Sequence, residues 1–414
     1  MCDSLISIGH PNYKDGRYEI NFSVPNCMRK FFRTTSFWFE CPDAGKVPDS
    51  IVAIPIVANL VPFAWIFDCE LRVESLDKEF YLALSEIKQG YASMLPNLHF
   101  AGRIEINNIV DNNKEHEYGS PLLLFSGGVD AWCTLVRHID EYPRLVSIWG
   151  ADIRCDNIAG WEIVDEYSRN VAKSLNVGYS YVKSNFWEMI NYRVLDSSSI
   201  MKKAGYGWWH DVQHGIGLLS LTSPLAYVRK SRIVYIASSN TEKDKGRYVC
   251  ASDPTIDNHF AAFTVRAFHD GYELTRQEKV DAIVQYAKRS LAPVNLRVCF
   301  NVQSGKNCCR CEKCGRTILE ILAAKGYPSK LGFEYTRRQF DLLMNKMHYI
   351  LRLSYPFYYH DVANAVRARG ISLPDSASWV LSGNLDRICN NKFKAALRSL
   401  RRLGGKIYHA IIGK

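Results

Sequence analysis

The stretch that decides the fold is Pro121-Leu-Leu-Leu-Phe-Ser-Gly-Gly-Val-Asp-Ala-Trp-Cys-Thr-Leu135. An apolar run, Leu122–Phe125, ends in Ser126-Gly127-Gly128-Val129-Asp130, and a stretch with helical character follows. This order predicts a strand, a glycine turn and the start of a helix. Glycines let the backbone come close to a ligand, and the free N–H groups of a first helical turn attract an anion. The stretch therefore indicates a phosphate-binding loop, with an ordinary strand-to-helix turn as the plainer interpretation.

Other common nucleotide-binding motifs are absent from the sequence. A Walker A loop requires G-x-x-x-x-G-K-[ST]. No lysine that follows a glycine in this chain is itself followed by serine or threonine. No G-x-G-x-x-G pattern opens a helix either. The prediction of a bound nucleotide therefore depends on residues 126–130 alone.

A group of cysteines gives the second strong signal. Four of them follow the spacing C-x8-C-x2-C-x2-C: Cys299, Cys308, Cys311 and Cys314. Four thiolates so close in sequence suit a tetrahedral Zn²⁺ with a structural role, because a closed four-cysteine site leaves no open coordination position. Cys309 could compete with Cys308 as a ligand, and an iron–sulfur cluster, disulfides or free thiols are the alternatives. Nearby cations would offset the negative charge of the thiolates: Lys306, Arg310, Lys313 and Arg316.

The loop resembles the PP-loop of ATP pyrophosphatases, whose pattern is S-G-G-x-D-S/T. With the cysteine spacing, the chain from about Pro121 to Arg316 is similar to 7-cyano-7-deazaguanine synthase, the QueC-type enzyme. The resemblance implies a PP-loop (HUP-like) fold, ATP and Mg²⁺ as cofactors beside Zn²⁺, and cleavage of ATP between the α and β phosphates. It assigns ATP binding to the loop residues Ser126, Gly127, Gly128, Val129, Asp130 and Ala131, with Ser126 and Asp130 also in catalysis. The chain departs from the pattern at Ala131, where the family carries a hydroxyl.

Further residues are candidates for the substrate site. The segment from His210 to Leu219 resembles the polar-to-apolar helix after the family's substrate loop, and Ser238-Ser239-Asn240 followed by Asp253 resembles its polar loop. The resulting candidates for substrate binding are His214, Lys243, Arg247 and Asp253, with Lys243 and Asp253 also proposed in catalysis. A structural histidine and a solvated cationic loop are the alternative interpretations.

The resemblance also implies a reaction. Family enzymes adenylate the carboxylate of 7-carboxy-7-deazaguanine, add ammonia and form a nitrile. The long N- and C-terminal extensions of this chain are more similar to larger QueC-like proteins of antiviral defence systems, where a partner-protein amine could replace ammonia. Three other functions stay open: a PP-loop enzyme that modifies tRNA, a sugar amidotransferase, and a nucleotide-binding scaffold that has lost catalysis.

Composition indicates a folded, soluble, cytoplasmic protein. Of the 414 residues, 47% are hydrophobic and 23% charged, which is typical of a globular chain. Thirteen cysteines without a recognisable secretory signal favour a reducing compartment. Ile51–Phe67 is almost wholly apolar, but Pro55 and Pro62 favour a buried strand–loop–helix over a membrane span.

The net charge of +10 is concentrated at the C-terminus. From Lys392 to Lys414 there are basic residues and no acid, so the rest of the chain is close to neutral and is not expected to bind nucleic acid. Apolar residues recur there at helical spacing among Arg398, Arg401 and Arg402. We expect a packed terminal helix with a basic face, or a contact of this tail with nucleic acid, an acidic partner or a membrane surface.

The overall pattern predicts an α/β protein in three regions. Residues 1–115 show strand signals and one helix over 82–94, which indicates an α+β accessory domain. Residues 116–330 alternate strands and helices, as in a doubly wound parallel sheet, and contain the cysteine group at 299–314. Residues 331–414 are expected to be mainly helical, with Phe340, Leu343, Met344 and Met347 forming an apolar face. The strands expected in the middle region are 122–125, 145–149, 179–182 and 233–237.

Overall fold

The computed structural model describes residues 4–113, 118–299 and 306–390. Contacts group the chain into two compact units. The first, here the sheet unit, comprises Met1–Ser126 and Asp130–Glu273, and the second, the helical unit, comprises Gly127–Val129 and Leu274–Lys414. The three regions expected from the sequence, with limits at 115 and 330, stay a prediction.

Five parallel strands form the centre of the sheet unit. They are β7 (Leu122–Leu124), β8 (Arg144–Trp149), β9 (Tyr179–Ser184), β10 (Ile233–Ala237) and β12 (Val265–Asp270). Their order across the sheet is β9-β8-β7-β10-β12, and each neighbouring pair is parallel. The four strands expected here are confirmed, and the α/β class with them. Because β8 lies on one side of β7 and β10 on the other, the direction of winding reverses between β7 and β10.

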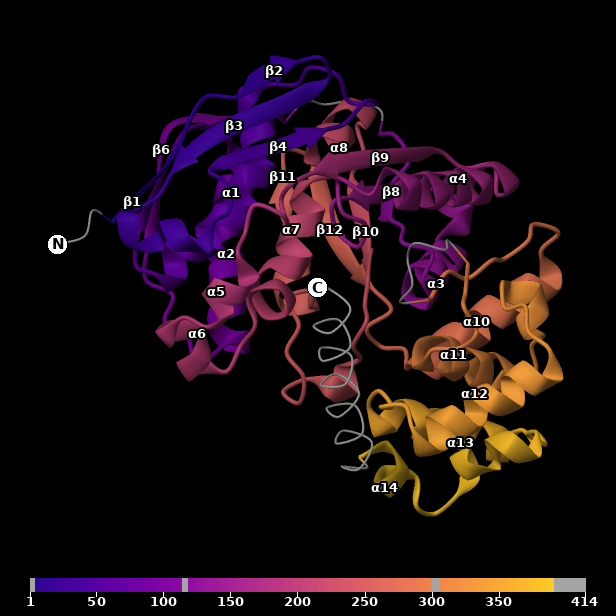
Figure 1. The fold of residues 1–414 in the computed structure, drawn as a ribbon. Helices are drawn as coiled ribbons and strands as arrows, with labels where there is room; N and C mark the ends of the chain where they lie inside the picture. The colour runs from indigo at the N-terminus through magenta and orange to yellow at the C-terminus, as the bar shows by residue number, and fades with distance from the viewer. Residues whose placement is uncertain (1–3, 114–117, 300–305, 391–414) are drawn as a thin grey trace, which may run out of the picture. The chain divides into compact units, whose positions relative to one another are not determined.

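Helices connect and cover these strands (Figure 1). Packing against the sheet is observed for α4 on β8 and β9, for α7 on β10 and for α8 on β12. The helices of this region are α3 (Val129–Arg137), α4 (Ile158–Ser174), α5 (Tyr192–Asp196), α6 (Ser199–Ala204), α7 (His214–Ser220), α8 (Ser223–Arg229) and α9 (Pro254–Asp257). A π-helical turn, Trp209–Gln213, leads directly into α7, so the helix expected over 210–219 begins as a wider coil.

The N-terminal strands continue the same sheet. They are β1 (Leu5–Ile8), β2 (Asn12–Lys14), β3 (Arg17–Ser23), β4 (Ser36–Glu40), β5 (Glu70–Asp77) and β6 (Arg103–Val110). Strand β4 pairs antiparallel with β9, as Figure 1 shows, and the short β11 (Ala261–Ala262) closes the other edge beside β12. The result is one mixed sheet of twelve strands. Helix α2 (Lys78–Met94) confirms the helix expected over 82–94, and Asp77 caps it by accepting from the Phe80 N–H at 3.0 Å.

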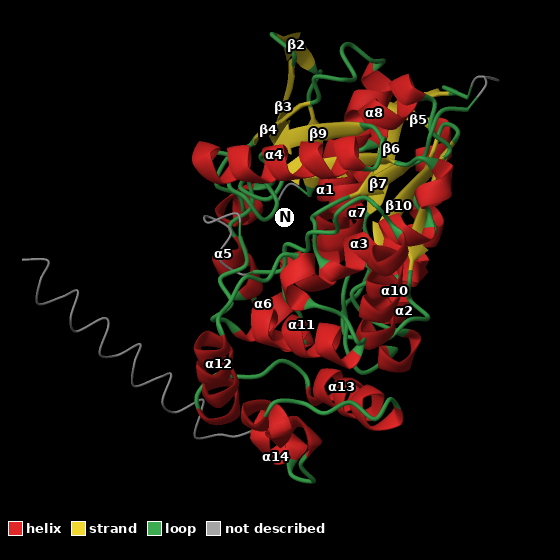
Figure 2. Ribbon diagram, turned by 90° about the vertical axis from the view of Figure 1, so that its right-hand side faces the viewer, coloured by secondary structure: helices red, strands yellow, loops and turns green. Residues whose placement is uncertain are grey.

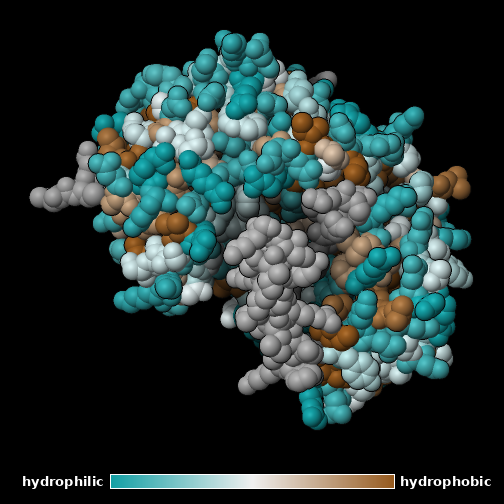
Figure 3. Space-filling view, in the orientation of Figure 1, coloured by the Kyte–Doolittle hydropathy of each residue, from teal (hydrophilic) through white to brown (hydrophobic). Residues whose placement is uncertain are grey.

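The apolar segment near residue 51 is a core helix. The expected strand–loop–helix is wrong: α1 (Asp49–Ile66) is one continuous helix with Pro55 and Pro62 inside it. It is long and apolar enough to cross a membrane, but 94% of it is buried inside the fold, against β5, α7 and α8. This extensive packing outweighs the backbone hydrogen bonds that the two prolines cannot make. The face seen in Figure 3 is mainly hydrophilic.

The helical unit has helices and no strand among its described residues (Figure 2). Its helices are α10 (Arg276–Arg289), α11 (Glu312–Ala323), α12 (Arg337–Tyr349), α13 (Pro356–Ala368) and α14 (Leu385–Cys389). The apolar face expected on α12 is confirmed by the burial of Phe340, Leu343, Met344 and Met347. The basic tail with Arg398, Arg401 and Arg402 lies outside the described residues.

Candidate nucleotide loop and candidate metal centre

The glycine loop joins β7 to α3 at the carboxyl end of the central strand. The Phe125 N–H donates to the Val146 carbonyl at 2.8 Å, and the Ser147 hydroxyl donates to the Phe125 carbonyl at 3.0 Å, which fixes the end of the strand. Gly127 has φ of +79°, a conformation that favours glycine. The chain then enters α3 at Val129, with Ser126 exposed and Asp130 half-buried. The predicted strand–turn–helix is therefore confirmed.

The position of this loop in the sheet favours ligand binding. The loop follows β7, and the winding of the sheet reverses between β7 and β10. Ligands of open α/β sheets bind outside the carboxyl ends of the strands at this reversal, where the connections on the two sides diverge. The first-turn N–H groups of α3 add a partial positive charge there. The loop can therefore hold a phosphate through its backbone.

Two details of the loop bear on its chemistry. Ala131 is buried in the first turn of α3, so a hydroxyl contact from this position is missing. Within the helical unit, the Arg297 N–H donates to the Gly127 carbonyl at 2.7 Å, which holds this peptide in place. A phosphate at this loop would therefore depend on the backbone amides.

The cationic candidates lie on the connection that follows β10. Thr241 and Asp244 close a short turn there, because both the N–H and the hydroxyl of Thr241 donate to Asp244 at 2.9 Å. The side chains of Lys243, Lys245 and Arg247 are exposed on it. They follow the strand that lies beside β7, so they belong to the same end of the sheet as the glycine loop. The Thr241–Asp244 turn thereby gives these cations a defined place at this end of the sheet.

His214 and Asp253 have local roles of different kinds. Burial lowers the pKa of His214 to about 4, so its imidazole is neutral at pH 7, and its Nδ1 lies 3.9 Å from Sγ of Cys250. Burial also raises the pKa of the Cys250 thiol to about 12, which excludes an activated thiolate–imidazolium pair here. Asp253 caps α9 by accepting from the Thr255 N–H at 2.9 Å. Trp208 is fully buried and packs against Phe63.

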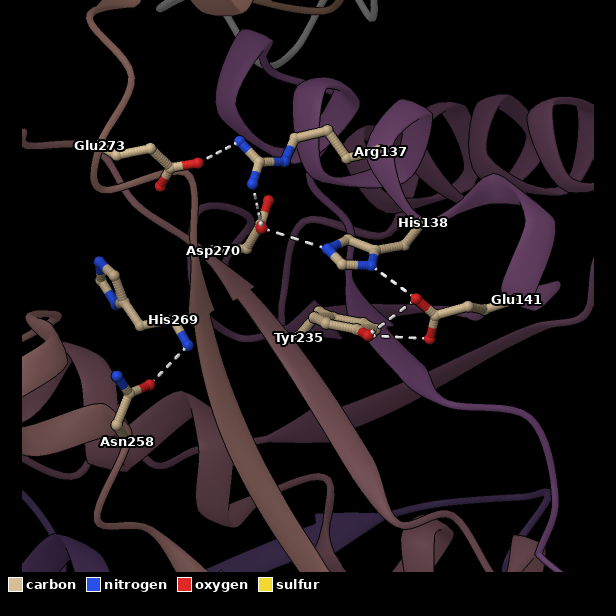
Figure 4. A network of polar contacts seen from close by, with 8 residues as sticks. All are labelled: Arg137, His138, Glu141, Tyr235, Asn258, His269, Asp270 and Glu273. Carbon is tan, nitrogen blue, oxygen red and sulfur yellow. Dashed lines mark hydrogen bonds and ion pairs between the residues drawn. The ribbon is translucent and has the colours of Figure 1, made fainter.

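A network of charged residues at the end of α3 was not anticipated from the sequence (Figure 4). The ring of His138 lies between two carboxylates, with Nε2 at 3.1 Å from Asp270 and Nδ1 at 2.7 Å from Glu141. Arg137 forms ion pairs with Asp270 at 3.3 Å and with Glu273. One feature of the sequence could have indicated this network. It is the polar pair His269-Asp270 at the end of a stretch in which apolar and polar residues alternate, and this stretch forms β12.

The four expected cysteines come together in the helical unit. The sulfur atoms of Cys299, Cys308, Cys311 and Cys314 all lie within 4.8 Å of one another. Cys299 and Cys311 are 4.0 Å apart, as are Cys308 and Cys314, close to the S–S edge of about 3.8 Å expected around a zinc ion. Cys309 is outside this group: its backbone has φ of +49°, and its thiol donates to the Asn307 carbonyl. The group could hold a metal ion such as zinc.

Backbone groups prepare these sulfur atoms for a metal. The Arg310 N–H donates to Cys308 at 3.4 Å, and the Cys314 N–H donates to Cys311 at 3.5 Å, where Cys311 caps α11. The hydrogen bond with Cys311, burial and the neighbouring thiols raise the pKa of Cys314, so without a metal this thiol is neutral. A bound cation reverses this balance because it deprotonates the thiols that coordinate it.

Arg316, expected to offset the thiolate charge, is instead paired within the helices. It is buried, its Nε lies 3.3 Å from Glu312, and its guanidinium stacks 4.1 Å from the ring of Tyr358. Glu320, one turn further along α11, accepts a hydrogen bond from Arg276 of α10 at 3.0 Å. These contacts link α10, α11 and α13 to one another.

Comparisons of the chain with family models, with curated proteins and with solved structures find no match. The features of the chain that bear on its function are therefore the glycine loop, the order of the strands and the cysteine group.

Proposed function

We propose that the chain is an ATP-dependent enzyme of the PP-loop type that activates a carboxylate as its adenylate and passes it to a nitrogen nucleophile. The observation that carries this proposal is the Ser126–Asp130 loop at the reversal point of the parallel sheet. A loop there presents backbone N–H groups and a helix N-terminus to a pyrophosphate. The QueC-like resemblance adds a substrate class to this proposal, namely a deazaguanine-type carboxylate.

The reaction follows from the charges involved. A carboxylate oxygen attacks the α-phosphorus of ATP, and the bond to the β-phosphate bridge oxygen breaks, with pyrophosphate leaving on the loop amides. Mg²⁺, when bound, neutralises phosphate charge, and Asp130 is the candidate that contacts it. Lys243 and Arg247, both exposed on the connection after β10, would hold a phosphate or the substrate carboxylate in this proposal. The nitrogen nucleophile then attacks the acyl carbon, and AMP leaves.

Zinc has a structural part in this proposal. Four cysteines fill a tetrahedral shell and leave no position for substrate. The site would join the segment before α11 to the start of that helix, and so would stabilise the helical unit.

Turnover with a defined pair of substrates tests the proposal. The purified chain, given ATP, Mg²⁺, 7-carboxy-7-deazaguanine and ammonium, should form AMP and pyrophosphate in equal amounts. Asp130→Ala should lower this rate at least about 100-fold, as expected for loss of a group at the reacting phosphates. Asp140→Ala, which removes an exposed carboxylate beyond α3, is the matched control and should keep full activity. Formation of ADP and phosphate would contradict the α-phosphate mechanism, and ATP binding without any turnover would favour the scaffold alternative.

A further inference from the structure

A buried polar chain lies at the end of β12, on residues that the proposed reaction does not yet use. Nδ1 of His269 lies 2.8 Å from Oδ2 of Asp257, and the Ser252 hydroxyl donates to the same oxygen at 2.8 Å. The side chains of His269 and Asp257 are both fully buried. The three residues come from β12, α9 and the segment before α9, all within the sheet unit.

This arrangement fixes the tautomer of the histidine. Oδ2 of Asp257 accepts from the Ser252 hydroxyl, and the remaining partner, Nδ1 of His269, must donate to it. The proton of the neutral imidazole therefore sits on Nδ1, and Nε2 carries a lone pair. A histidine oriented in this way by a carboxylate can accept a proton at Nε2.

The accepting atom has no protein partner. Among the described residues, Nε2 of His269 makes no hydrogen bond and is fully buried. A buried acceptor without a partner is costly in free energy, so such atoms are usually paired with a ligand or retained for a function. The backbone N–H of His269 is held separately by Asn258 at 2.8 Å, as Figure 4 shows.

The surrounding helix keeps the pair enclosed. A Cβ atom on Gly215 of α7 would lie 2.2 Å from Oδ1 of Asp257, so the helix passes directly over the carboxylate. This contact shields the carboxylate on the side of α7. Because Nε2 of His269 is itself buried, a small cation such as ammonium can reach it more readily than the amine of a partner protein.

The position of the pair matches the proposed reaction. His269 pairs with Ile236 of β10, one residue before the carboxyl end of that strand, and β10 lies directly beside β7. His269 is therefore on the same end of the sheet as the glycine loop. The exposed turn with Lys243 and Arg247 lies on the connection that follows β10.

From these observations we infer that His269, oriented by Asp257 and Ser252, is a catalytic base that deprotonates ammonium for attack on the acyl adenylate. This inference rests on the proposed function. Nε2 takes one proton from ammonium, and the nitrogen lone pair so released forms the C–N bond. The C–O bond to AMP breaks with its electron pair on AMP, and a second proton leaves the nitrogen to water as the amide forms.

The test separates the two half-reactions. ATP–pyrophosphate exchange with 7-carboxy-7-deazaguanine reports adenylation, and amide formation from ammonium reports the second step. His269→Gln should keep exchange while amide formation falls about 100-fold, within the range for loss of a general base. Hydroxylamine, which is largely unprotonated at neutral pH, should restore product formation because it needs no base. The exposed His259→Gln is the matched control and should change neither step.

Asp257→Asn provides a second variant of nearly equal shape. The asparagine amide donates to Nδ1 and moves the imidazole proton to Nε2, so amide formation should fall while hydroxylamine still reacts. Equal losses with ammonium and hydroxylamine, or unchanged amide formation in His269→Gln, would overturn the inference. Absence of exchange in the unaltered protein would instead contradict the proposed function itself.

Discussion

Nε2 of His138 lies 3.1 Å from Oδ1 of Asp270, and this contact ties the end of α3 to the carboxyl end of β12. Because Nδ1 of the same ring lies 2.7 Å from Glu141, both ring nitrogens face a carboxylate. Only the imidazolium can donate to both. Burial opposes this charge, but the two hydrogen bonds and the two negative charges outweigh it and raise the pKa of His138.

The raised pKa predicts a pH dependence of stability. Since the folded pKa lies above the unfolded value of about 6.5, the stabilisation is complete below that pH. It is lost as the pH rises through the folded pKa. We expect His138→Gln to lower the free energy of unfolding by about 1–2 kcal/mol at pH 6, with a smaller difference at pH 8.5. Urea unfolding at several pH values measures this, and a constant difference across the series would show that His138 is not charged in the fold.

The pKa of Asp270 is shifted in the opposite direction, so its contribution to stability changes with pH in the opposite way. Burial would raise the pKa of this carboxyl, but hydrogen bonds from His138 and Thr134 and the charge of Arg137 outweigh it, and the pKa is lowered. Its contribution is therefore present above the unfolded pKa of about 3.9 and is lost as the pH falls through the folded value.

Asp270→Asn should therefore be costly near neutral pH. Removing the buried anion leaves two cations facing each other, at a cost of about 3 kcal/mol in the free energy of unfolding. Asp156→Asn, which breaks an exposed ion pair with Arg154, should have little effect. The two variants are compared by urea unfolding at pH 7, and similar losses in both would contradict the importance of burial at Asp270.

The sequence predicted the local patterns better than the long-range ones. The strand before Ser126, the apolar face of α12 and the cysteine spacing each depend on a few neighbouring residues, and each was found. By contrast, α1 was misjudged because its prolines were weighed without the packing that surrounds them. The pairing of β4 with β9 joins residues about 145 positions apart, as in Phe39 with Ser184, and no local pattern reveals it.

The residues of the candidate site also divide into those that a local pattern reveals and those that only the fold brings together. The glycine loop could be found because its residues are adjacent in sequence. The Asp257–His269 pair and the His138–Asp270 pair could not, because each forms only when the end of a helix packs beside β12 in the fold. A histidine or aspartate at the end of a strand was the available signal, and it gains meaning only with the partner that the fold supplies.

The cysteine group predicts one zinc ion per chain. Cys311→Ser should lose the metal and lower the thermal midpoint of unfolding, because a structural site couples binding to folding. Cys309→Ser is the matched control, since its buried thiol, whose pKa is raised by burial to about 11, lies outside the group. Elemental analysis under reducing conditions measures zinc and iron, and equal zinc in both variants would contradict this ligand set. An iron content with visible absorbance would indicate a cluster instead.

The contact of α7 with Asp257 predicts a strong effect of a single methyl group. Gly215→Ala would place its Cβ against Oδ1 of Asp257 and the Ala251 carbonyl, so we expect a loss of about 1–3 kcal/mol in the free energy of unfolding. Gly207→Ala, before the same helix, meets only Asp211 at 3.9 Å and should be tolerated. Urea unfolding of the two variants decides the point, and equal stability would show that the helix can move away from the pair.

The basic tail gives the last prediction, because it separates two possible acceptors. Charge reversal at Arg398, Arg401 and Arg402 removes a docking surface that a macromolecular partner would use, but leaves the loop and the His269 pair unchanged. If ammonium is the acceptor, as the enclosed Nε2 indicates, amide formation should stay at the level of the unaltered protein. ATP binding should also be unchanged.

The matching measurement uses the same variant in two assays. Amide formation from ammonium is followed with purified protein, and modification of co-expressed proteins is followed by mass spectrometry. Loss of a protein adduct in the charge-reversed variant, with no amide formed from ammonium by either form, would establish a macromolecular acceptor docked on the tail. It would also exclude the ammonium route and with it the role of His269 as the base for ammonium.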